Sequence, residues 1–441
     1  MEKIYIHLSD IHFGQERGGA LVVNNDVKEQ LLQDVRKFIF TVPNGKADGV
    51  IVSGDIAFAG KPSEYQTAGQ WLDRLTAVSG CDKTSVQLVP GNHDIDRESI
   101  THIVQSIIDE IIAGGDTALD KYLESESDRE VLYRRFAAYR SFAEAYDCPL
   151  DADGGILNHR TVEISAGKFL KFYGVNTALI CSNSKKEKGG LLLGARQRVI
   201  GTPDSTETIV IAHHPLSWLQ DSDEAMTYIR NRARVFVSGH EHQPTHEIVM
   251  VDQTKNLLML ASGAAIPPSA NEIYNYCYNV LIFNYEDKSN ELIVTIHGRT
   301  WNHATKTFES DNTHFTDGIQ AYRLQCPNFV DKAGTQSTLC QKEITTITSN
   351  AVISETSERN GVESYIMSDK QNQLVLLNFF RNLTAVQRLT ILIELGSIPD
   401  GFSEPLTHTI ERRALDNLLE QGKSNFVTDA INKVLLPKIS E

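Results

Sequence analysis

Long apolar runs are missing from this sequence of 441 residues, and none approaches the roughly 18 residues that a membrane-spanning helix needs. The first residues, Met1–Ile6, run directly into a strand-like segment and leave no room for a signal peptide. We therefore expect no targeting segment and no membrane partner.

Cysteine is also scarce, and the six cysteines are scattered without any C-x-x-C spacing. This pattern argues against both a zinc ribbon and a disulfide framework. Because unpaired cysteines are typical of a reducing compartment, we expect a cytoplasmic protein.

Basic residues are outnumbered, with 42 Lys and Arg against 57 Asp and Glu, and the formal net charge is −15. A strongly acidic chain lacks the broad basic footprint of a non-specific nucleic-acid binder, although bound metal ions reverse the sign of charge locally. Two local basic clusters, residues 185–188 and Arg230–Arg234, are interpreted as solvated faces.

The N-terminal part of the chain alternates strands and helices. Strands are predicted at Lys3–Ser9, Gly49–Ser53 and Ser85–Val89, and helices at Asp26–Phe40 and Ser63–Ala77. Because two βαβ units in succession imply a mostly parallel sheet flanked by helices, the fold class is α/β.

Strand signals return after an acidic, helix-rich stretch, Glu98–Asp147, which we interpret as an insertion beside the ends of the first strands. The later strands are predicted at Thr161–Ile164, Phe169–Val175, Thr208–Ala212, Val235–Ser238, His246–Val251, Leu257–Ala261, Tyr278–Phe283 and Leu292–Ile296. Their spacing favours an antiparallel meander, and therefore a second or a mixed sheet.

The C-terminal part of the chain differs from the rest in amino-acid composition. Residues 326–370 are rich in Ser, Thr, Asn and Glu, as a linker is. Four short helices are then predicted at Gln373–Phe380, Thr384–Leu395, Thr407–Gln421 and Ser424–Leu436. We divide the chain into a main domain (1–325, with the insertion 98–147), a linker (326–370) and a small all-α domain (371–441).

Five short polar motifs each follow a predicted strand, where ligand sites form in open α/β sheets. They are Asp10-Ile11-His12, Gly54-Asp55, Gly91-Asn92-His93-Asp94, His213-His214-Pro215 and Gly239-His240-Glu241-His242. Together they offer oxygen and imidazole ligands in the numbers that two divalent metal ions need. Two adjacent metal ions are a recurrent device for hydrolysing phosphate esters.

Spacing suggests which side chains act together. Asp10 and His12 are two residues apart after a strand, so both side chains can leave the same edge, and His240 and His242 repeat this spacing. A carboxylate can bridge two ions through its two oxygens, and Asp55 is the bridging candidate.

The remaining motifs add a possible acid. Asn92 offers an amide oxygen, His93 can protonate a leaving alkoxide, and Asp94 can orient the His93 ring. His213 and His214 are adjacent, and adjacent residues of a strand point in opposite directions, so His213 is chosen as the ligand. His214 either contacts the substrate or is a satisfied core histidine.

In this order the motifs resemble the calcineurin-like metallophosphoesterase superfamily, whose pattern runs D-x-H, G-D, G-N-H-[DE], H and G-H-x-H, over about residues 3–300. The resemblance implies a four-layer α/β/β/α sandwich, here with the helical insertion and the C-terminal all-α domain added. It implies one metal ion held by Asp10, His12, Asp55 and His242, another held by Asp55, Asn92, His213 and His240, and His93 as the acid. A metal-bound hydroxide attacks phosphorus in line in such sites. Nitrogen and oxygen ligands suit Mn, Fe, Zn or Mg, and we favour Mn.

The sequences of Leu8–Gly14 and of the His213 motif resemble those of the phosphodiesterase and nuclease branches. Gly54–Gly60, in contrast, lacks the Arg that is typical of phosphoprotein phosphatases. The tail from Gln373 is similar to death-like helical adaptor domains attached to effector enzymes in bacterial defence systems. A plain helical oligomerisation module fits it equally well. We therefore expect a protein partner or self-association through residues 371–441.

The leading hypothesis is a dinuclear-metal phosphodiesterase that hydrolyses phosphodiester bonds in nucleic acid or nucleotides. Within it, we favour an effector nuclease controlled through the C-terminal helices. A cyclic-nucleotide phosphodiesterase and a phosphomonoesterase are the alternatives of the same class. A metal-stabilised binding scaffold without catalysis is the alternative of another class.

Overall fold

The computed structural model describes residues 2–15, 20–150, 158–182, 187–252, 255–267, 275–329, 358–402 and 406–435. Most of the expected linker, residues 330–357, therefore lies outside the described residues, as do Lys185 and Lys186 of the first basic cluster. The five described cysteines are all free thiols, in agreement with the absence of a disulfide pattern in the sequence.

The first sheet is mixed, with the strand order β12-β11-β10-β1-β2-β3 and β13 paired to β11. Its strands are β1 (Lys3–Leu8), β2 (Gly49–Val52), β3 (Val86–Leu88), β10 (Cys277–Glu286), β11 (Glu291–Asn302), β12 (Thr307–Ser310) and β13 (Ile319–Gln325). Only β1, β2 and β3 are parallel, and β10 joins β1 antiparallel. The predicted mostly parallel sheet is therefore confirmed for three strands only, and β12 and β13 were not predicted.

The second sheet has the order β4-β5-β6-β7-β9-β8. Its strands are β4 (Asn158–Ser165), β5 (Lys168–Gly174), β6 (Thr206–Ile211), β7 (Ala233–Ser238), β8 (Pro244–Met250) and β9 (Asn256–Ser262). The four central strands are parallel, and only the outer pairs β4/β5 and β8/β9 are antiparallel. The expected second sheet is confirmed, and the expected antiparallel pairing holds for β4/β5, β8/β9 and β10/β11. It is wrong for the central strands of this sheet, because the helices α6 (Ala195–Arg198) and α7 (Ser222–Arg232), which were not predicted, lie in two of the crossovers.

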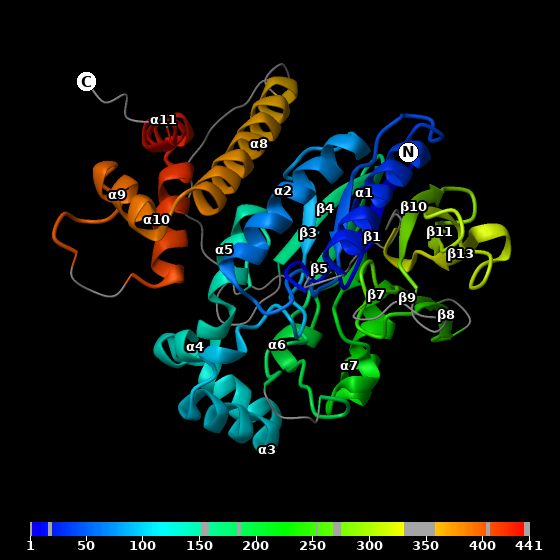
Figure 1. Ribbon diagram of the computed structural model, residues 1–441, viewed down its shortest axis with the longest axis horizontal. Coiled ribbons are helices and arrows are strands. Elements are labelled where there is room, and N and C mark those ends of the chain that lie inside the picture. Colours follow the sequence, from blue (N-terminus) through cyan, green and yellow to red (C-terminus); the bar gives the residue numbers. More distant parts are fainter. Residues whose placement is uncertain are drawn as a thin grey trace, which may run out of the picture.

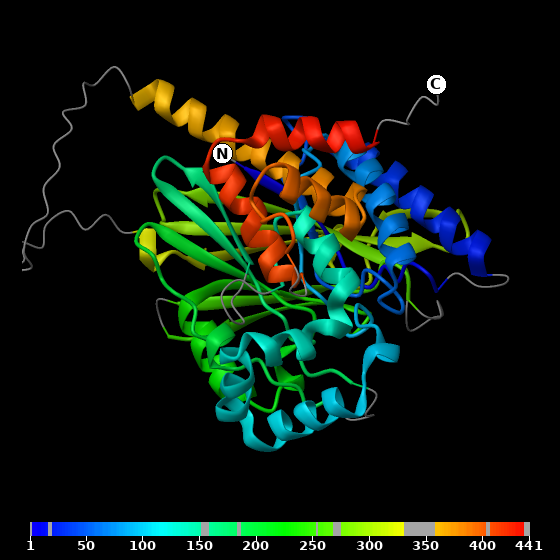
Figure 2. The same ribbon diagram turned by 90° about the vertical axis from the view of Figure 1, so that its left-hand side faces the viewer.

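The two sheets pack face to face, and their inner faces form one core. Tyr5 of the first sheet packs on Phe172 of the second, with ring centroids 5.0 Å apart, and Phe283 contacts both rings. The helices α1 (Ala20–Ile39) and α2 (Pro62–Ser79) cover the outer face of the first sheet, and α7 packs on β6 and β7 of the second. The predicted four-layer α/β/β/α sandwich is confirmed (Figures 1 and 2).

The insertion is helical, as predicted. It comprises α3 (His102–Glu124), α4 (Glu126–Tyr133) and α5 (Ala137–Ala145), with short 3-10 turns at Arg97–Ser99 and Arg134–Phe136. Thr101 and Ser125 cap α3 and α4, because their side chains accept the backbone N–H of Val104 and Asp128. The insertion begins directly after the Gly91–Asp94 motif, so it lies beside the ends of the strands.

The C-terminal helices are α8 (Glu358–Asn382), α9 (Ala385–Glu394), α10 (His408–Glu420) and α11 (Ser424–Leu435). The first of them begins at Glu358 rather than at Gln373, within the segment expected to be a linker. It packs against α5 of the insertion (Figure 1). Among the described residues, no helix has the combination of length and apolar character that crossing a membrane demands.

Candidate metal centre

The polar side chains of the five motifs stand on turns that directly follow strands. The turns follow β1, β2 and β3 in the first sheet and β6 and β7 in the second. Ten side chains are involved: Asp10, His12, Asp55, Asn92, His93, Asp94, His213, His214, His240 and His242. Both sheets thus deliver their carboxyl ends to one place, and several of these side chains have ligand atoms within 4.8 Å of one another.

Five of the seven predicted ligands have left-handed backbone conformations. The φ angles are 53° at Asp10, 50° at His12, 52° at Asp55, 70° at His240 and 59° at His242. The backbone amide of His12 donates to the carbonyl of Asp55 (3.0 Å), and that of His240 donates to Oδ2 of Asp10 (3.1 Å). These pairs therefore share a side because of strained turns, which cost on the order of 1 kcal/mol each, and the predicted strand alternation is the wrong explanation.

Two glycines let the turns approach one another closely. A Cβ atom on Gly54, which has φ +96°, would stand 2.5 Å from Nδ1 of His213. A Cβ atom on Gly91 would stand 2.1 Å from Oδ1 of Asp55. A larger residue at Gly54 would push apart the contributions of the two sheets, and one at Gly91 would push apart the turns after β2 and β3 of the first sheet.

The first group of side chains comprises Asp10, His12 and His242. Nδ1 of His12 donates to the carbonyl of Ile266 (3.1 Å), so Nε2 of the neutral ring carries the lone pair. That Nε2 lies 3.3 Å from Oδ2 of Asp55, and Nε2 of His242 lies 3.2 Å from Oδ1 of Asp10. The group is an arrangement of electron-pair donors that face one another.

The second group is built around His213, which is fully buried. Its Nδ1 donates to the carbonyl of Ser53 (2.8 Å), which leaves the lone pair on Nε2. That Nε2 lies 3.2 Å from Oδ1 of Asn92, 3.3 Å from Oδ2 of Asp55 and 3.2 Å from Nδ1 of His240. Lone pairs at these distances repel one another unless a positive charge lies between them.

The electrostatics of the site favour that positive charge. Burial opposes protonation of His213, yet the adjacent Asp55 carboxylate raises the pKa of this imidazole to about 9. Burial also opposes ionisation of Asp55, but the charge of protonated His213 and the hydrogen bonds that protonated His12 and His213 donate hold the pKa of Asp55 well below the usual range. Oδ2 of Asp55 faces a histidine of each group, so the residues fit two divalent cations with Asp55 between them.

The His93 ring lies at the edge of these groups. Its Nδ1 donates to the backbone carbonyl of Phe58 (2.8 Å), and its ring stacks on that of Phe58 with centroids 5.3 Å apart. The ring also meets the edge of His12, with centroids 4.9 Å apart. Since Nδ1 is committed to a carbonyl, Nε2 is the nitrogen left to give or take a proton.

The predicted role of Asp94 as the residue that orients His93 is wrong. The Asp94 carboxylate instead accepts the backbone N–H groups of Ile56 (3.2 Å), Ala57 (2.9 Å) and Gly91 (2.9 Å), and the Tyr65 hydroxyl (2.9 Å). Burial, followed by the Asp55 charge, raises its pKa to about 6. Asp94 therefore joins the turn after β2 to the turn after β3.

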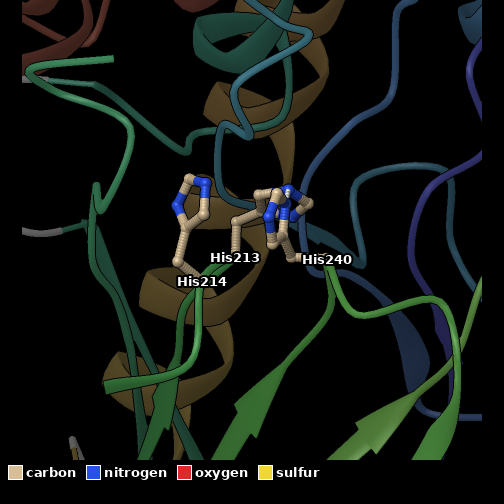
Figure 3. A group of neighbouring side chains, drawn as sticks. All are labelled: His213, His214 and His240. Atoms are coloured by element: carbon tan, nitrogen blue, oxygen red, sulfur yellow. Dashed lines mark hydrogen bonds between the residues drawn. The ribbon is translucent and has the colours of Figure 1, made fainter. Parts of the chain in front are cut away.

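Adjacency on a strand predicts that the side chains of His213 and His214 point in opposite directions. In the structure they do not diverge. Both rings lie on the same side of the turn (Figure 3), with centroids 4.7 Å apart, and a nitrogen of His214 belongs to a ligand group with His213 and His240. Nδ1 of His214 lies 2.9 Å from Oγ1 of Thr177. Nε2 is buried and has no hydrogen-bond partner among the described residues. Burial and the charge of His213 hold the pKa of His214 well below its usual range, so the ring is neutral.

Two aromatic residues of the site were missed in the sequence. The Phe58 carbonyl holds His93, and the Trp218 ring meets the edge of the His240 ring at a centroid distance of 4.2 Å and an angle of 83°. Both follow a motif closely, Asp55 in one case and His214 in the other. Their positions relative to the motifs are the only signal that the sequence carries.

A two-sheet sandwich that gathers such ligand sets at its strand ends defines the class of metal-dependent phosphoesterases. The model of calcineurin-like phosphoesterases matches residues 5–244, and the chain belongs to this family. The family binds a dinuclear divalent metal centre, and the described ligand groups fit one. Residues 371–433 match the model of a GTPase-associated adaptor domain, so the helical adaptor resemblance of the tail is confirmed.

Similar proteins cover only parts of the chain. Over 281 residues, 60% of this chain and 54% of the other protein, it is 22% identical to the uncharacterized metallophosphoesterase-like protein YydB of Bacillus subtilis (strain 168). Over 94 residues, 20% of this chain and 28% of the other, it is 37% identical to the glycerophosphodiester phosphodiesterase GpdQ of Enterobacter lignolyticus (strain SCF1). The chain thus spans about half or less of these curated relatives.

Among solved structures, purple acid phosphatase PPD1 of yellow lupin aligns with a TM-score of 0.41 and 11% identity, covering 77% of this chain and 57% of that one. NAD nucleotidase of Haemophilus influenzae aligns with a TM-score of 0.33 and 10% identity, covering 70% of this chain and 53% of that one.

Proposed function

We propose that the protein is a dinuclear-metal phosphodiesterase that hydrolyses phosphodiester bonds in nucleic acid or nucleotides. The observation that supports it most is the convergence of the His213 lone pair, the Asn92 oxygen and the Asp55 carboxylate in a buried site. When bound, two divalent cations lower the pKa of water and polarise phosphoryl oxygens. The ligands are nitrogen and oxygen atoms without thiolate, which suits Mn, Fe, Zn or Mg, and we propose Mn.

The chain's own residues then have separate tasks. Asp10, His12, Asp55 and His242 hold one cation, and Asp55, Asn92, His213 and His240 hold the other. His93 donates a proton from Nε2 to the leaving oxygen, because its Nδ1 is fixed by the Phe58 carbonyl. The free Nε2 of His214 contacts a substrate oxygen. Asp94 and Tyr65 keep the two turns in register.

A diester is favoured over a monoester by the wording of the motifs and by the similarity to a glycerophosphodiester phosphodiesterase over a fifth of the chain. The test is the turnover of bis(p-nitrophenyl) phosphate and of p-nitrophenyl phosphate by the Mn-loaded protein. We expect the diester to be hydrolysed faster. Faster hydrolysis of the monoester would identify a phosphomonoesterase, and no hydrolysis of either ester would identify a binding scaffold.

The C-terminal helices give this activity a proposed partner. We propose that residues 371–441 bind a protein partner or a second copy of the chain and thereby control an effector nuclease of a bacterial defence system. The match to a GTPase-associated adaptor domain supports this role. We also propose a cytoplasmic location, which the five free thiols support. Light scattering of the full chain, alone and with candidate partners, tests whether these helices associate.

A further inference from the structure

The segment 187–191 is fixed beside the metal centre. The backbone amide of Gly189 donates to the carbonyl of Trp218 (2.8 Å), and that of Gln220 donates to the carbonyl of Leu191 (2.6 Å). Leu191 also pairs with Leu219 in a parallel bridge. The turn after β6, which carries His213 and His214, therefore determines where this segment lies.

This anchoring places Lys188 near the predicted ligands. The Lys188 Nζ atom lies 5.7 Å from the centroid of the Trp218 ring, and the same ring contacts His240. The Trp218 ring thus contacts both the ammonium group and a side chain of the second ligand group. Lys188, the described lysine of the basic cluster at residues 185–188, is exposed, as expected of a solvated face, and it also lies against an aromatic ring of the site.

Of the two described cations Arg97 and Lys188 at this edge, Lys188 is the one whose charge is not already matched. Arg97 donates to the carbonyl of Ser182 (3.1 Å) and to Oε1 of Glu187 (3.3 Å), which neutralises it. Lys188 is exposed and forms no ion pair with any residue that the structure describes. Its ammonium group is therefore available to an anion that enters the site.

The overall charge explains why a local cation matters. With a formal net charge of −15, the protein as a whole repels a polyanion, so capture of one depends on cations at the site. The Trp218 ring contacts both Lys188 and His240, so the ammonium group lies beside the candidate metal ligands, where a scissile phosphate would be held. An anion at Lys188 is therefore a second, neighbouring group of the same substrate.

We propose that Lys188 binds the phosphate next to the scissile one, so that the substrate is a short nucleic-acid strand rather than a cyclic nucleotide or an isolated diester. This inference rests on the proposed phosphodiesterase function. Trp218 supports the position of the ammonium group beside the ligands. Lys188 is a specificity-determining residue, and it takes no part in the hydrolytic step.

The test compares thymidine dinucleotides without and with one additional terminal phosphate: TpT, pTpT and TpTp. For the Mn-loaded protein, we expect the additional phosphate on one end to lower KM about three- to fivefold without changing kcat, as one exposed ion pair does. Lys188→Gln should remove this advantage and leave the KM for TpT unchanged. Lys188→Glu should turn the advantage into a penalty.

Lys37→Gln is the matched control, because Lys37 is an exposed lysine in the last turn of α1, the end of that helix away from the strand ends. It should keep the full advantage of the additional phosphate. Calorimetric titration of the metal-free protein gives a readout without turnover. The affinity for the favoured dinucleotide should exceed that for TpT in the wild-type protein, and the two should be equal in Lys188→Gln.

An advantage that persists in Lys188→Gln, or is absent in the wild-type protein, overturns the inference while leaving the phosphodiesterase proposal intact. The same holds if aryl diesters are hydrolysed and no dinucleotide is. If neither aryl diesters nor dinucleotides are hydrolysed, the proposed function itself is wrong. A salt dependence of the advantage that disappears with Lys188→Gln adds support.

Discussion

The metal centre and the surface that seats the C-terminal helices both concentrate charged side chains, yet they arrange them in opposite ways. At the metal centre, predicted carboxylate and imidazole ligands such as Asp10 and His242 face one another on strained turns. We call the surface of α2 and α5 around Asp73, Glu144 and Asp147 the C-terminal seat. Each of these three acidic residues forms an ion pair with a basic residue of the C-terminal helices.

The pairs of the C-terminal seat are well formed. Both Nη atoms of Arg381 donate to the Asp73 carboxylate (2.7 and 2.8 Å). Arg412 pairs with Glu144 and Asp147, and Nε2 of His408 lies 3.1 Å from Oε1 of Glu144. Groups that satisfy one another hold an assembly together, whereas groups that converge without satisfying one another indicate a site for a ligand.

Substitution of the bridging carboxylate should have the largest effect. Asp55→Ala removes the oxygen that faces both His12 and His213, so diester turnover should fall at least about a thousandfold and the bound metal should decrease. Metal analysis and steady-state kinetics measure both. Full turnover by Asp55→Ala would show that the converging side chains do not form a ligand site, and the contrast with the C-terminal seat would be lost.

His93→Ala should have the next largest effect, and on turnover alone. Loss of a general acid lowers kcat by about 10²–10⁴, while the ligand groups remain in place. We therefore expect metal content and the melting temperature to stay at wild-type values. A loss of metal in this variant would show that His93 acts as a ligand instead.

At the C-terminal seat the effect should be on stability and not on turnover. Arg412→Ala leaves the buried Glu144 carboxylate without its arginine, which should lower the free energy of unfolding by about 2–4 kcal/mol. Arg413→Ala, at the exposed neighbouring position, is the control and should cost little. Urea denaturation measures both variants, and equal losses would argue against a specific seat.

The smallest effect is a pH dependence of the same pair. Burial opposes ionisation of Glu144, but the Arg412 charge and the hydrogen bond from His408 lower its pKa to about 2 from the usual 4.5. A folded-state pKa below the unfolded value contributes stability above about pH 4.5, and this contribution is lost as the pH falls toward 2. The stability difference between wild type and Glu144→Gln should therefore shrink between pH 5 and 3. A constant difference over this range would contradict the pairing.

Most of the candidate site residues were predictable because they belong to short polar motifs that directly follow strands. The grouping of Asp10 with His12 followed from their spacing after one strand, and the grouping of His213 with Asn92 followed from the family resemblance. The left-handed turns were not predictable, since Asp and His can adopt either conformation and tertiary hydrogen bonds select between them. The hydrogen bond from His93 to the Phe58 carbonyl was equally unpredictable, because every residue has a backbone carbonyl and the sequence does not indicate which one accepts.

The fold shows the same division. The alternation of β1 to β3 with α1 and α2 was predictable because their hydrophobic periods are strong. The parallel strands at the centre of the second sheet were expected to be antiparallel, because strand spacing alone does not reveal a crossover through a helix as polar as α7. The start of α8 at Glu358 was missed since the polar residues before Gln373 have the composition of a linker.

The most direct test of the account is the electron paramagnetic resonance spectrum of the protein loaded with Mn²⁺, together with its metal stoichiometry. We expect two manganese ions per chain and an exchange-coupled spectrum that Asp55→Ala converts into that of isolated ions, since Asp55 lies between the two ligand groups. One ion per chain, or an uncoupled spectrum in the wild-type protein, would contradict it.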